Sequence, residues 1–202
     1  ITVFSFHPVK IITTCEGGIC TTNDPNLYNR LCRYRSHGIT RQPKEMLNKP
    51  DGSWYYEQLD LGFNFRLNDL MSALGLSQLN KLDKFISERE KIAQLYNSLL
   101  EKTSIITPRQ SIDSTSSRHL YIIRIPNNRN VIFENLRNNG IGVNVHYIPI
   151  YRQPFYKQYN FKYKDFTEAE NYYKEAISIP IYPGLSESQQ EKIVKIIQDP
   201  PG

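Results

Sequence analysis

The segment from Leu67 to Glu101 most constrains the fold, because its apolar residues recur at the spacing of one helix face. In the first part the pattern falls on Leu67, Leu70, Met71, Leu74, Gln78, Leu79 and Leu82, and in the second on Phe85, Ile92, Leu95, Tyr96, Leu99 and Leu100. We predict consecutive helices over 67–82 and 84–101, with apolar faces that serve as core or dimer surface rather than as a cofactor site. The helices mark a passage between subdomains, which gives expected domains of residues 1–82 and 83–202.

Upstream of these helices, two short apolar segments and a capped helix are expected. Residues 1–6 and 17–22 read as strands on either side of a loop that contains Lys10. Asp24 and Pro25 are typical of a helix start, and Gly38 is suited to the left-handed conformation that ends a helix. Residues 39–60 show no periodicity, which predicts a long loop of the functional or mobile kind.

Downstream, helix and strand patterns alternate. Residues 119–126 predict a strand, 130–139 a helix, 141–146 a second strand and 177–180 a third. Thr167-x-x-Glu170 and Ser186-x-x-Gln189 fit capping boxes, so helices are expected over 168–176 and 187–198. The fold class expected from this order is α/β, with an α+β domain at the C-terminal end.

Composition and charge limit the classes of molecule that the chain is expected to bind. The formal net charge of +5 suits anionic substrates such as phosphates or nucleotide sugars, and the basic residues are scattered rather than gathered into a nucleic-acid-binding stripe. No segment is apolar enough to span a membrane, and we expect a soluble, cytoplasmic protein without nucleic acid or membrane partners. The cysteines Cys15, Cys20 and Cys32 match no zinc spacing, so reduced thiols and no metal site are expected.

Lys10 is the candidate nucleophile. It follows an apolar segment and precedes β-branched residues, and a poorly hydrated lysine can lose its proton near neutral pH. An unprotonated lysine amine attacks an aldehyde to form a Schiff base, most commonly with pyridoxal phosphate. The alternative is a lysine at the end of an edge strand with its ammonium group in water.

Several motifs occur together and in one order. They are Ser5-Phe-x-x-x-Lys10, Thr13-Thr-x-Glu-Gly-Gly18, Arg35-Ser-His-Gly38, Gly62-Phe-Asn-Phe-Arg-Leu-Asn-Asp69, Ala73-Leu-Gly-Leu-Ser-Gln-Leu79 and Gly140-Ile-Gly-Val-x-Val-His-Tyr-x-Pro149. Over residues 1–197 the sequence thereby resembles the DegT/DnrJ/EryC1/StrS sugar aminotransferases. Within that family, Ser-Phe-His-Pro-Val-Lys is most similar to the UDP-4-amino-4,6-dideoxy-N-acetyl-β-L-altrosamine transaminases of pseudaminic acid biosynthesis.

The resemblance implies a fold-type I aminotransferase that uses pyridoxal 5'-phosphate and is a homodimer. Residues 1–82 would be the remainder of the cofactor-binding large domain, and residues 83–202 the small α+β domain. An amino group, expected to come from glutamate, would be transferred to a 4-keto-6-deoxy UDP-sugar. Related dehydratases carry histidine in place of the lysine, so Lys10 favours transamination.

The resemblance also implies roles for individual residues. Lys10 would carry the cofactor and then move protons, Ser5 would bind the cofactor phosphate, and Asn64 would reach the phosphate of a neighbouring subunit. His146 and Tyr147 would line the substrate entrance. Each has an alternative: a serine bonded to local backbone, an asparagine in a turn before a helix, and packing at a strand end for His146 and Tyr147. His37 fits the C-terminal end of a helix.

The family lysine normally lies near the middle of a chain about twice this long, whereas here it is residue 10. We therefore expect the C-terminal portion of such an enzyme, without the acid that pairs with the pyridine nitrogen and the aromatic that stacks on the ring. Alone, this portion is expected not to transaminate and to expose apolar surface. The alternative is a non-catalytic remnant or interaction module of the family.

Overall fold

The computed structural model describes residues 1–199, and these divide into two compact units. The first unit is Ile1–Leu82 and the second begins at Asp83. The assignment of the first to a large domain and of the second to a small domain stays a prediction.

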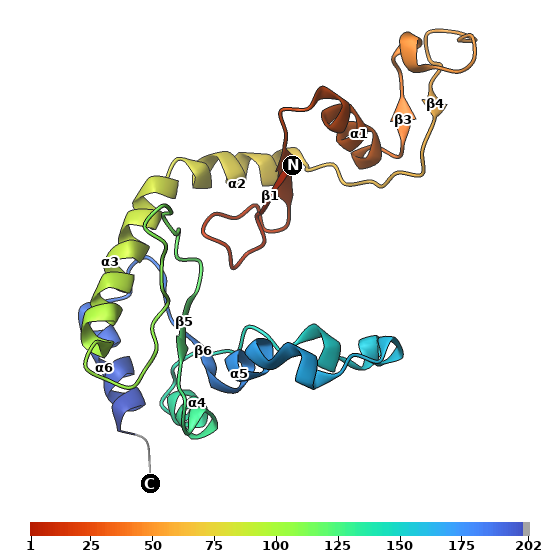
Figure 1. Cartoon of the computed structure of the whole chain (residues 1–202). Coiled ribbons are helices and arrows are strands. Elements are labelled where there is room, and N and C mark those ends of the chain that lie inside the picture. The colour runs from red at the N-terminus through yellow and green to blue at the C-terminus, as the bar shows by residue number, and fades with distance from the viewer. Residues whose placement is uncertain (200–202) are drawn as a thin grey trace. The chain divides into compact units, whose positions relative to one another are not determined.

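The first unit opens with an antiparallel hairpin (Figure 1). Strand β1 (Thr2–Ser5) pairs with β2 (Gly18–Thr21), in a register that sets Phe4 opposite Ile19. Helix α1 (Pro25–Arg35) follows, and the Asp24 carboxylate accepts from the backbone N–H groups of Asn26 and Leu27. Gly38, with φ of +74°, takes the left-handed conformation expected beyond the helix. Helix α2 (Asp69–Leu79) closes the unit, capped by the side chain of Asn68.

Residues 39–60 are more ordered than the sequence indicated. Strands β3 (Ile39–Thr40) and β4 (Glu57–Gln58) pair antiparallel, and a 3₁₀ turn, η1 (Pro43–Glu45), lies between them (Figure 1). The buried Glu57 carboxylate accepts from the backbone N–H groups of Leu47 at 2.6 Å and Asn48 at 2.8 Å. The β3–β4 pairing and the hydrogen bonds to Glu57 order this segment, and neither leaves a periodic pattern in the sequence.

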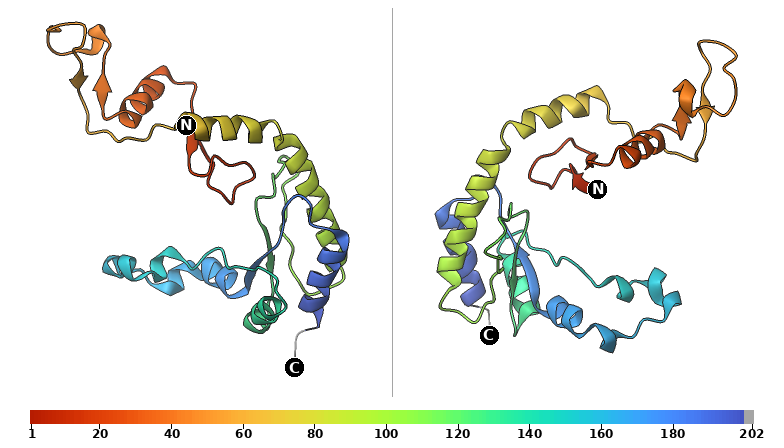
Figure 2. Two further views of the ribbon diagram at one scale, coloured as in Figure 1. Left: turned by 180° about the vertical axis from the view of Figure 1, so that it is seen from behind. Right: turned by 45° about the horizontal axis from the view of Figure 1, so that its top comes forward.

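The second unit is built around an antiparallel strand pair and a small helical layer. Its elements are α3 (Leu82–Leu100), β5 (Tyr121–Arg124), α4 (Arg129–Asn138), the 3₁₀ turns η2 (Ile150–Arg152), η3 (Pro154–Tyr159) and η4 (Tyr163–Phe166), α5 (Thr167–Glu175), β6 (Ala176–Ile179) and α6 (Glu187–Gln198). Strand β5 pairs with β6, with Tyr121 opposite Ile179. Both views of Figure 2 show α6 running beside α3, and the Gln190 amide donates to the Ile92 carbonyl at 2.9 Å between them.

The hydrophobic core of the described residues lies in this second unit. Alternate residues of β5 point into it, and both Tyr121 and Ile123 are fully buried. Helices α3, α4 and α6 supply the facing residues, which include Tyr96, Leu100, Leu136 and Ile193. Burial raises the pKa of both Tyr96 and Tyr121.

Two predictions for this unit are wrong. Residues 141–146 form no strand, because only Asn144 bridges to Ser178, on the edge of β6 that β5 leaves open. The Asn144 side chain accepts from the Val145 N–H at 2.8 Å, so that donor is directed to a side chain rather than to a sheet partner. Helix α5 lacks the predicted capping box: the Thr167 hydroxyl donates to the Lys164 carbonyl instead.

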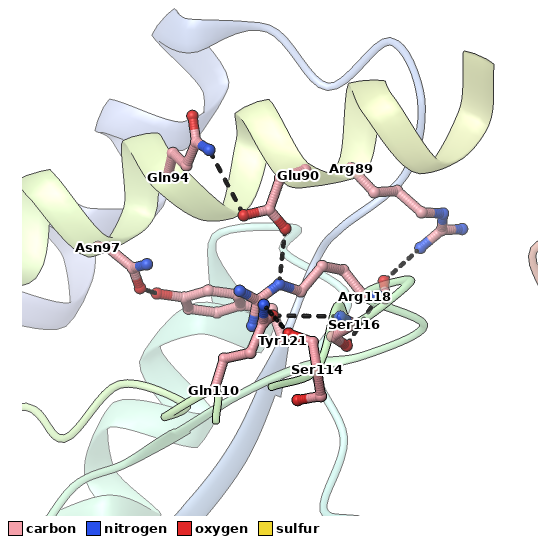
Figure 3. Close-up of polar contacts among 9 residues, drawn as sticks. All are labelled: Arg89, Glu90, Gln94, Asn97, Gln110, Ser114, Ser116, Arg118 and Tyr121. Atoms are coloured by element: carbon pink, nitrogen blue, oxygen red, sulfur yellow. Dashed lines mark hydrogen bonds and ion pairs between the residues drawn. The ribbon is translucent and has the colours of Figure 1, made fainter. Parts of the chain in front are cut away.

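A buried polar cluster fastens α3 to the chain that leads into β5 (Figure 3). The Arg89 guanidinium is buried and donates to the carbonyls of Arg118, His119 and Ile181. Glu90, next along the helix, pairs with Arg118 at 2.9 Å. Burial lowers the pKa of Arg89, which remains a cation. The cluster therefore supplies hydrogen-bond donors to backbone carbonyls that lie just outside strands β5 and β6.

The mixture of helices and strands confirms the α/β class that the sequence predicted. Within residues 1–199 all three strand pairs are antiparallel and two-stranded. None of the helices described is long and apolar enough to cross a membrane.

Candidate functional site

Lys10 lies in the loop that joins β1 to β2, which we call the lysine loop (residues 6–17). Backbone hydrogen bonds close the base of this loop. The Phe6 N–H donates to the Gly17 carbonyl at 2.9 Å, and the Thr14 N–H donates to the Phe6 carbonyl at 3.0 Å. The loop therefore has a fixed base from which Lys10 projects.

The hydroxyl groups of two threonines form hydrogen bonds to the backbone of the loop. The Thr13 hydroxyl donates to the Phe6 carbonyl at 2.9 Å and accepts from the Cys15 N–H at the same distance. The Thr14 hydroxyl donates to the Glu16 carbonyl at 2.8 Å, and Thr14 is buried. These contacts hold the backbone at Cys15, where φ is +65°. Neither threonine was predicted as a site residue, although adjacent Thr residues close before a Glu-Gly-Gly turn are suited to side chain–backbone hydrogen bonds.

Helix α2 packs against the loop at a glycine. A Cβ atom added to Gly75 would lie 2.8 Å from the Thr14 Cγ2 methyl group, and one added to Gly17 would lie 2.5 Å from the Thr14 hydroxyl. Glycine is therefore required where α2 and the loop approach each other. This contact links the lysine loop to the helix predicted from leucine periodicity.

The structure places Lys10 in a loop between two strands, as the sequence predicted. It lies in the loop beyond β1, not at the end of the strand, and its side chain is partly exposed. Its backbone N–H donates to the His7 carbonyl at 2.9 Å, which closes a turn over His7-Pro8-Val9-Lys10.

Ser5 is the last residue of β1, so it enters the same loop five positions before Lys10. Its Oγ accepts from the backbone N–H of His7 at 3.4 Å. A hydroxyl that accepts one hydrogen bond can also donate its own hydrogen to an anion. The local-backbone alternative and the phosphate-binding role are thus compatible.

Asn64 lies in the extended segment between β4 and α2, in the same unit. It forms an isolated antiparallel bridge with Ser36, and its Oδ1 accepts from the Arg66 guanidinium at 3.0 Å. Phe63 and Phe65 stack on each other with ring centroids 4.7 Å apart. Because Oδ1 is occupied, the amide group presents its N–H donors, which suit a phosphate oxygen.

His146 and Tyr147 belong to the second unit. The Nδ1 atom of His146 lies 2.6 Å from the hydroxyl of Ser178, a buried residue of β6. Tyr147 is exposed and meets the imidazole ring edge-on, with 4.6 Å between centroids. Ser178 was not predicted as a site residue. It is the single polar residue of a strand that is buried on both faces, and a buried hydroxyl group needs a hydrogen-bond partner.

The tyrosines that follow, at 151, 156, 159 and 163, form a chain of ring contacts with Phe155, Phe161 and Phe166. Tyr151 and Arg152 both bond to Glu170, and the hydrogen bond from Arg152 lowers the pKa of that carboxyl. This aromatic stretch of the second unit therefore packs largely against its own rings.

The structure places Ser5 at the end of β1, Lys10 in the loop that follows it, and Asn64 in the same unit. The residues present fit pyridoxal 5'-phosphate in part: an amine for the aldehyde, and hydroxyl and amide donors for the phosphate. Across residues 1–199 no set of three or more His, Cys, Asp or Glu side chains could hold a metal ion. Cys15, Cys20 and Cys32 are free thiols.

The fold matches that of solved sugar aminotransferases. Helicobacter pylori PseC, an aminotransferase involved in the biosynthesis of pseudoaminic acid, has a TM-score of 0.84 and 35% identity over 97% of this chain and 52% of its own. Streptococcus pneumoniae Spr1654, described as a sugar aminotransferase, gives a TM-score of 0.83 in its PLP-form, at 29% identity over 97% of this chain and 50% of its own.

The sequence comparisons agree with the fold. The model of the DegT/DnrJ/EryC1/StrS aminotransferase family matches residues 1–198, and this chain belongs to that family. The Campylobacter jejuni UDP-4-amino-4,6-dideoxy-N-acetyl-beta-L-altrosamine transaminase is 38% identical over 92% of this chain and 48% of its own length. Bacillus subtilis spore coat polysaccharide biosynthesis protein SpsC is 34% identical over 98% of this chain and 53% of its own. The chain thus spans about half the length of these relatives, and the predicted family is confirmed.

Proposed function

We propose that this chain carries the lysine half-site of a pyridoxal-phosphate-dependent aminotransferase that acts on a nucleotide sugar. The observation that carries the proposal is the placement of Lys10 in a loop that begins directly after Ser5 and has its base closed by backbone hydrogen bonds, in a chain of the sugar aminotransferase family. The net charge of +5 is compatible with an anionic UDP-sugar.

The residues would act as follows. Bound pyridoxal phosphate supplies an electron sink for the carbon from which a proton is removed. Lys10 Nζ would hold the cofactor and then take that proton and return it, as general base and general acid. The Ser5 hydroxyl and the Asn64 amide would bind phosphate oxygens, Asn64 from a neighbouring subunit of a homodimer. His146 and Tyr147 would contact the nucleotide sugar.

The finer assignment follows the family resemblance. We propose a 4-keto-6-deoxy UDP-sugar as the acceptor, because the similar C. jejuni protein is named as a transaminase of a 4-amino-4,6-dideoxy UDP-sugar. Glutamate as the amino donor is proposed from the family resemblance alone. Both substrates carry negative charge. A non-catalytic remnant of the family is the competing candidate, and cofactor attachment separates the two.

The test is a titration of the chain with pyridoxal phosphate, followed by borohydride reduction and peptide mapping. We expect label on Lys10 that disappears in Lys10→Arg, a variant that keeps a cation but loses the nucleophilic amine. Lys49→Arg, an exposed position of the same unit, is the matched control and should leave the label unchanged. Label spread evenly over surface lysines, or unchanged in Lys10→Arg, would support the remnant instead.

A further inference from the structure

We propose that His7 is a positioning residue that sets the geometry of the lysine loop between Ser5 and Lys10. The inference deepens the proposed function and rests on it, since it assigns a role to the residue between the phosphate-binding and cofactor-binding side chains. Pro8 has no N–H group and fixes its own φ, so the turn depends on its neighbours for hydrogen bonds.

His7 contacts the loop on three sides. Its N–H donates to Ser5 Oγ at 3.4 Å, its carbonyl accepts from the Lys10 N–H at 2.9 Å, and its imidazole Nδ1 accepts from the Val9 N–H at 3.5 Å. The backbone of His7 therefore joins Ser5 to Lys10, and the imidazole holds the residue between them. The contacts at 3.4 Å and 3.5 Å are longer than an ordinary N–H hydrogen bond, so each is weaker than the 2.9 Å bond from the Lys10 N–H.

The contacts define one form of the imidazole ring. Because Nδ1 accepts a hydrogen bond, the neutral ring carries its hydrogen on Nε2. Nε2 lies 3.9 Å from the carboxylate of Glu16, on the opposite arm of the loop, next to the glycine that bonds to Phe6. Glu16 is largely exposed, so we assign the positioning effect to Nδ1 and only a minor part to the Glu16 contact.

The first test needs no cofactor. In the ¹⁵N-labelled chain at alkaline pH, where the ring is neutral, NMR should show His7 protonated at Nε2 and unprotonated at Nδ1. Amide hydrogen exchange at Val9 and Lys10 should be faster in His7→Ala than in the unmodified chain. A ring protonated at Nδ1, or unchanged exchange at both amides, would overturn the inference.

The second test uses conservative replacements that separate the two ring nitrogens. An asparagine amide can replace Nδ1 as an acceptor, whereas a glutamine reaches toward the place of Nε2. We expect the rate of borohydride-trapped label on Lys10 to fall about fivefold in His7→Ala and His7→Gln, and to stay within about twofold of the unmodified rate in His7→Asn. His37→Asn, a histidine of the same unit outside the loop, is the control. Equal rates in His7→Asn and His7→Gln would contradict the assignment to Nδ1.

The outcomes keep the two proposals apart. If the unmodified chain takes no specific label at Lys10, the proposed function fails, and the ring form and amide exchange alone decide the role of His7. If Lys10 is labelled specifically but at the same rate in His7→Ala, the proposed function stands and the positioning role is lost.

Discussion

Gly75 of helix α2 packs against Thr14 of the lysine loop. The two residues are so close that replacing Gly75 with alanine, which adds one methyl group, tests the contact. The Thr14 methyl would lie 2.8 Å from an added Cβ at position 75. Helix propensity alone favours alanine over glycine by about 1 kcal/mol, so packing and propensity oppose each other here.

We expect Gly75→Ala to destabilise the first unit by about 1–3 kcal/mol, because overpacking at a close contact outweighs the gain in helix propensity. Chemical denaturation followed by circular dichroism measures the change. Gly142→Ala is the matched control, since an added Cβ there has no neighbour within 4 Å, and it should be close to neutral. A stabilised Gly75→Ala variant would show that the loop and α2 do not approach as described.

Glu57 accepts hydrogen bonds from three residues of the segment 39–60 and holds them beside β4. Backbone N–H donation from Leu47, with further donation from Asn48 and Tyr55, lowers the pKa of its carboxyl. A group with a depressed folded-state pKa contributes stability above its unfolded-state pKa and loses it as pH falls through the folded-state value.

We therefore expect Glu57→Gln to lower the melting temperature of the first unit at neutral pH. The difference from the unmodified chain should shrink as pH falls below the usual glutamate pKa of about 4.3. Limited proteolysis should cut residues 46–56 faster in the variant, and Glu45→Gln tests whether the neighbouring acid has the same effect. A difference that persists at low pH would argue against charge as the cause.

At the scale of elements, local signals located helices better than strands. Asp24 and Ser186 cap their helices with side chains as the sequence predicted, because an N-cap needs only residues adjacent in the chain. The strand predicted over 141–146 failed because a strand requires a partner, and only Asn144 finds one. Thr167 fits a capping box by spacing, but Glu170 is taken by Arg152 and Tyr151.

We predict that Ser186 and Thr167, the first residues of the two capping boxes expected from sequence, contribute differently to the stability of the second unit. Ser186→Ala should destabilise it by about 1 kcal/mol, since the hydroxyl accepts from the Gln189 N–H and the box is complete. Thr167→Ala should cost markedly less, because its hydroxyl makes only a 3.3 Å bond to the Lys164 carbonyl. Urea unfolding of both variants compares them. Equal losses would mean that the capping geometry does not control α6.

At the scale of the whole molecule, the two units bury their apolar side chains to different extents. The second unit buries a continuous core, whereas α2 buries none of its residues and leaves Leu70 85% and Leu76 67% exposed. Leu61 and Phe65 on the segment before α2 are also exposed. A face of this kind is typical of a surface that another polypeptide covers.

We expect the isolated chain to bind a hydrophobic dye and to associate in solution. The double variant Leu70→Ser and Leu76→Ser should reduce both, because it removes apolar area from α2 without touching the described core. Dye fluorescence and light scattering measure the effect, with Lys49→Ser as a surface control. A monodisperse chain without dye binding would contradict this expectation.

The sequence by itself determined the family, the helices, the lysine loop and the candidates Ser5, Lys10 and Asn64, since these depend on motifs and neighbours along the chain. Only the tertiary structure decided that Thr14 packs against Gly75 in the first unit and that Ser178 lies beside His146 in the second. The physical reason is distance along the chain. A hydrogen bond or close contact between residues far apart in sequence leaves no periodic pattern, so it is settled by packing alone.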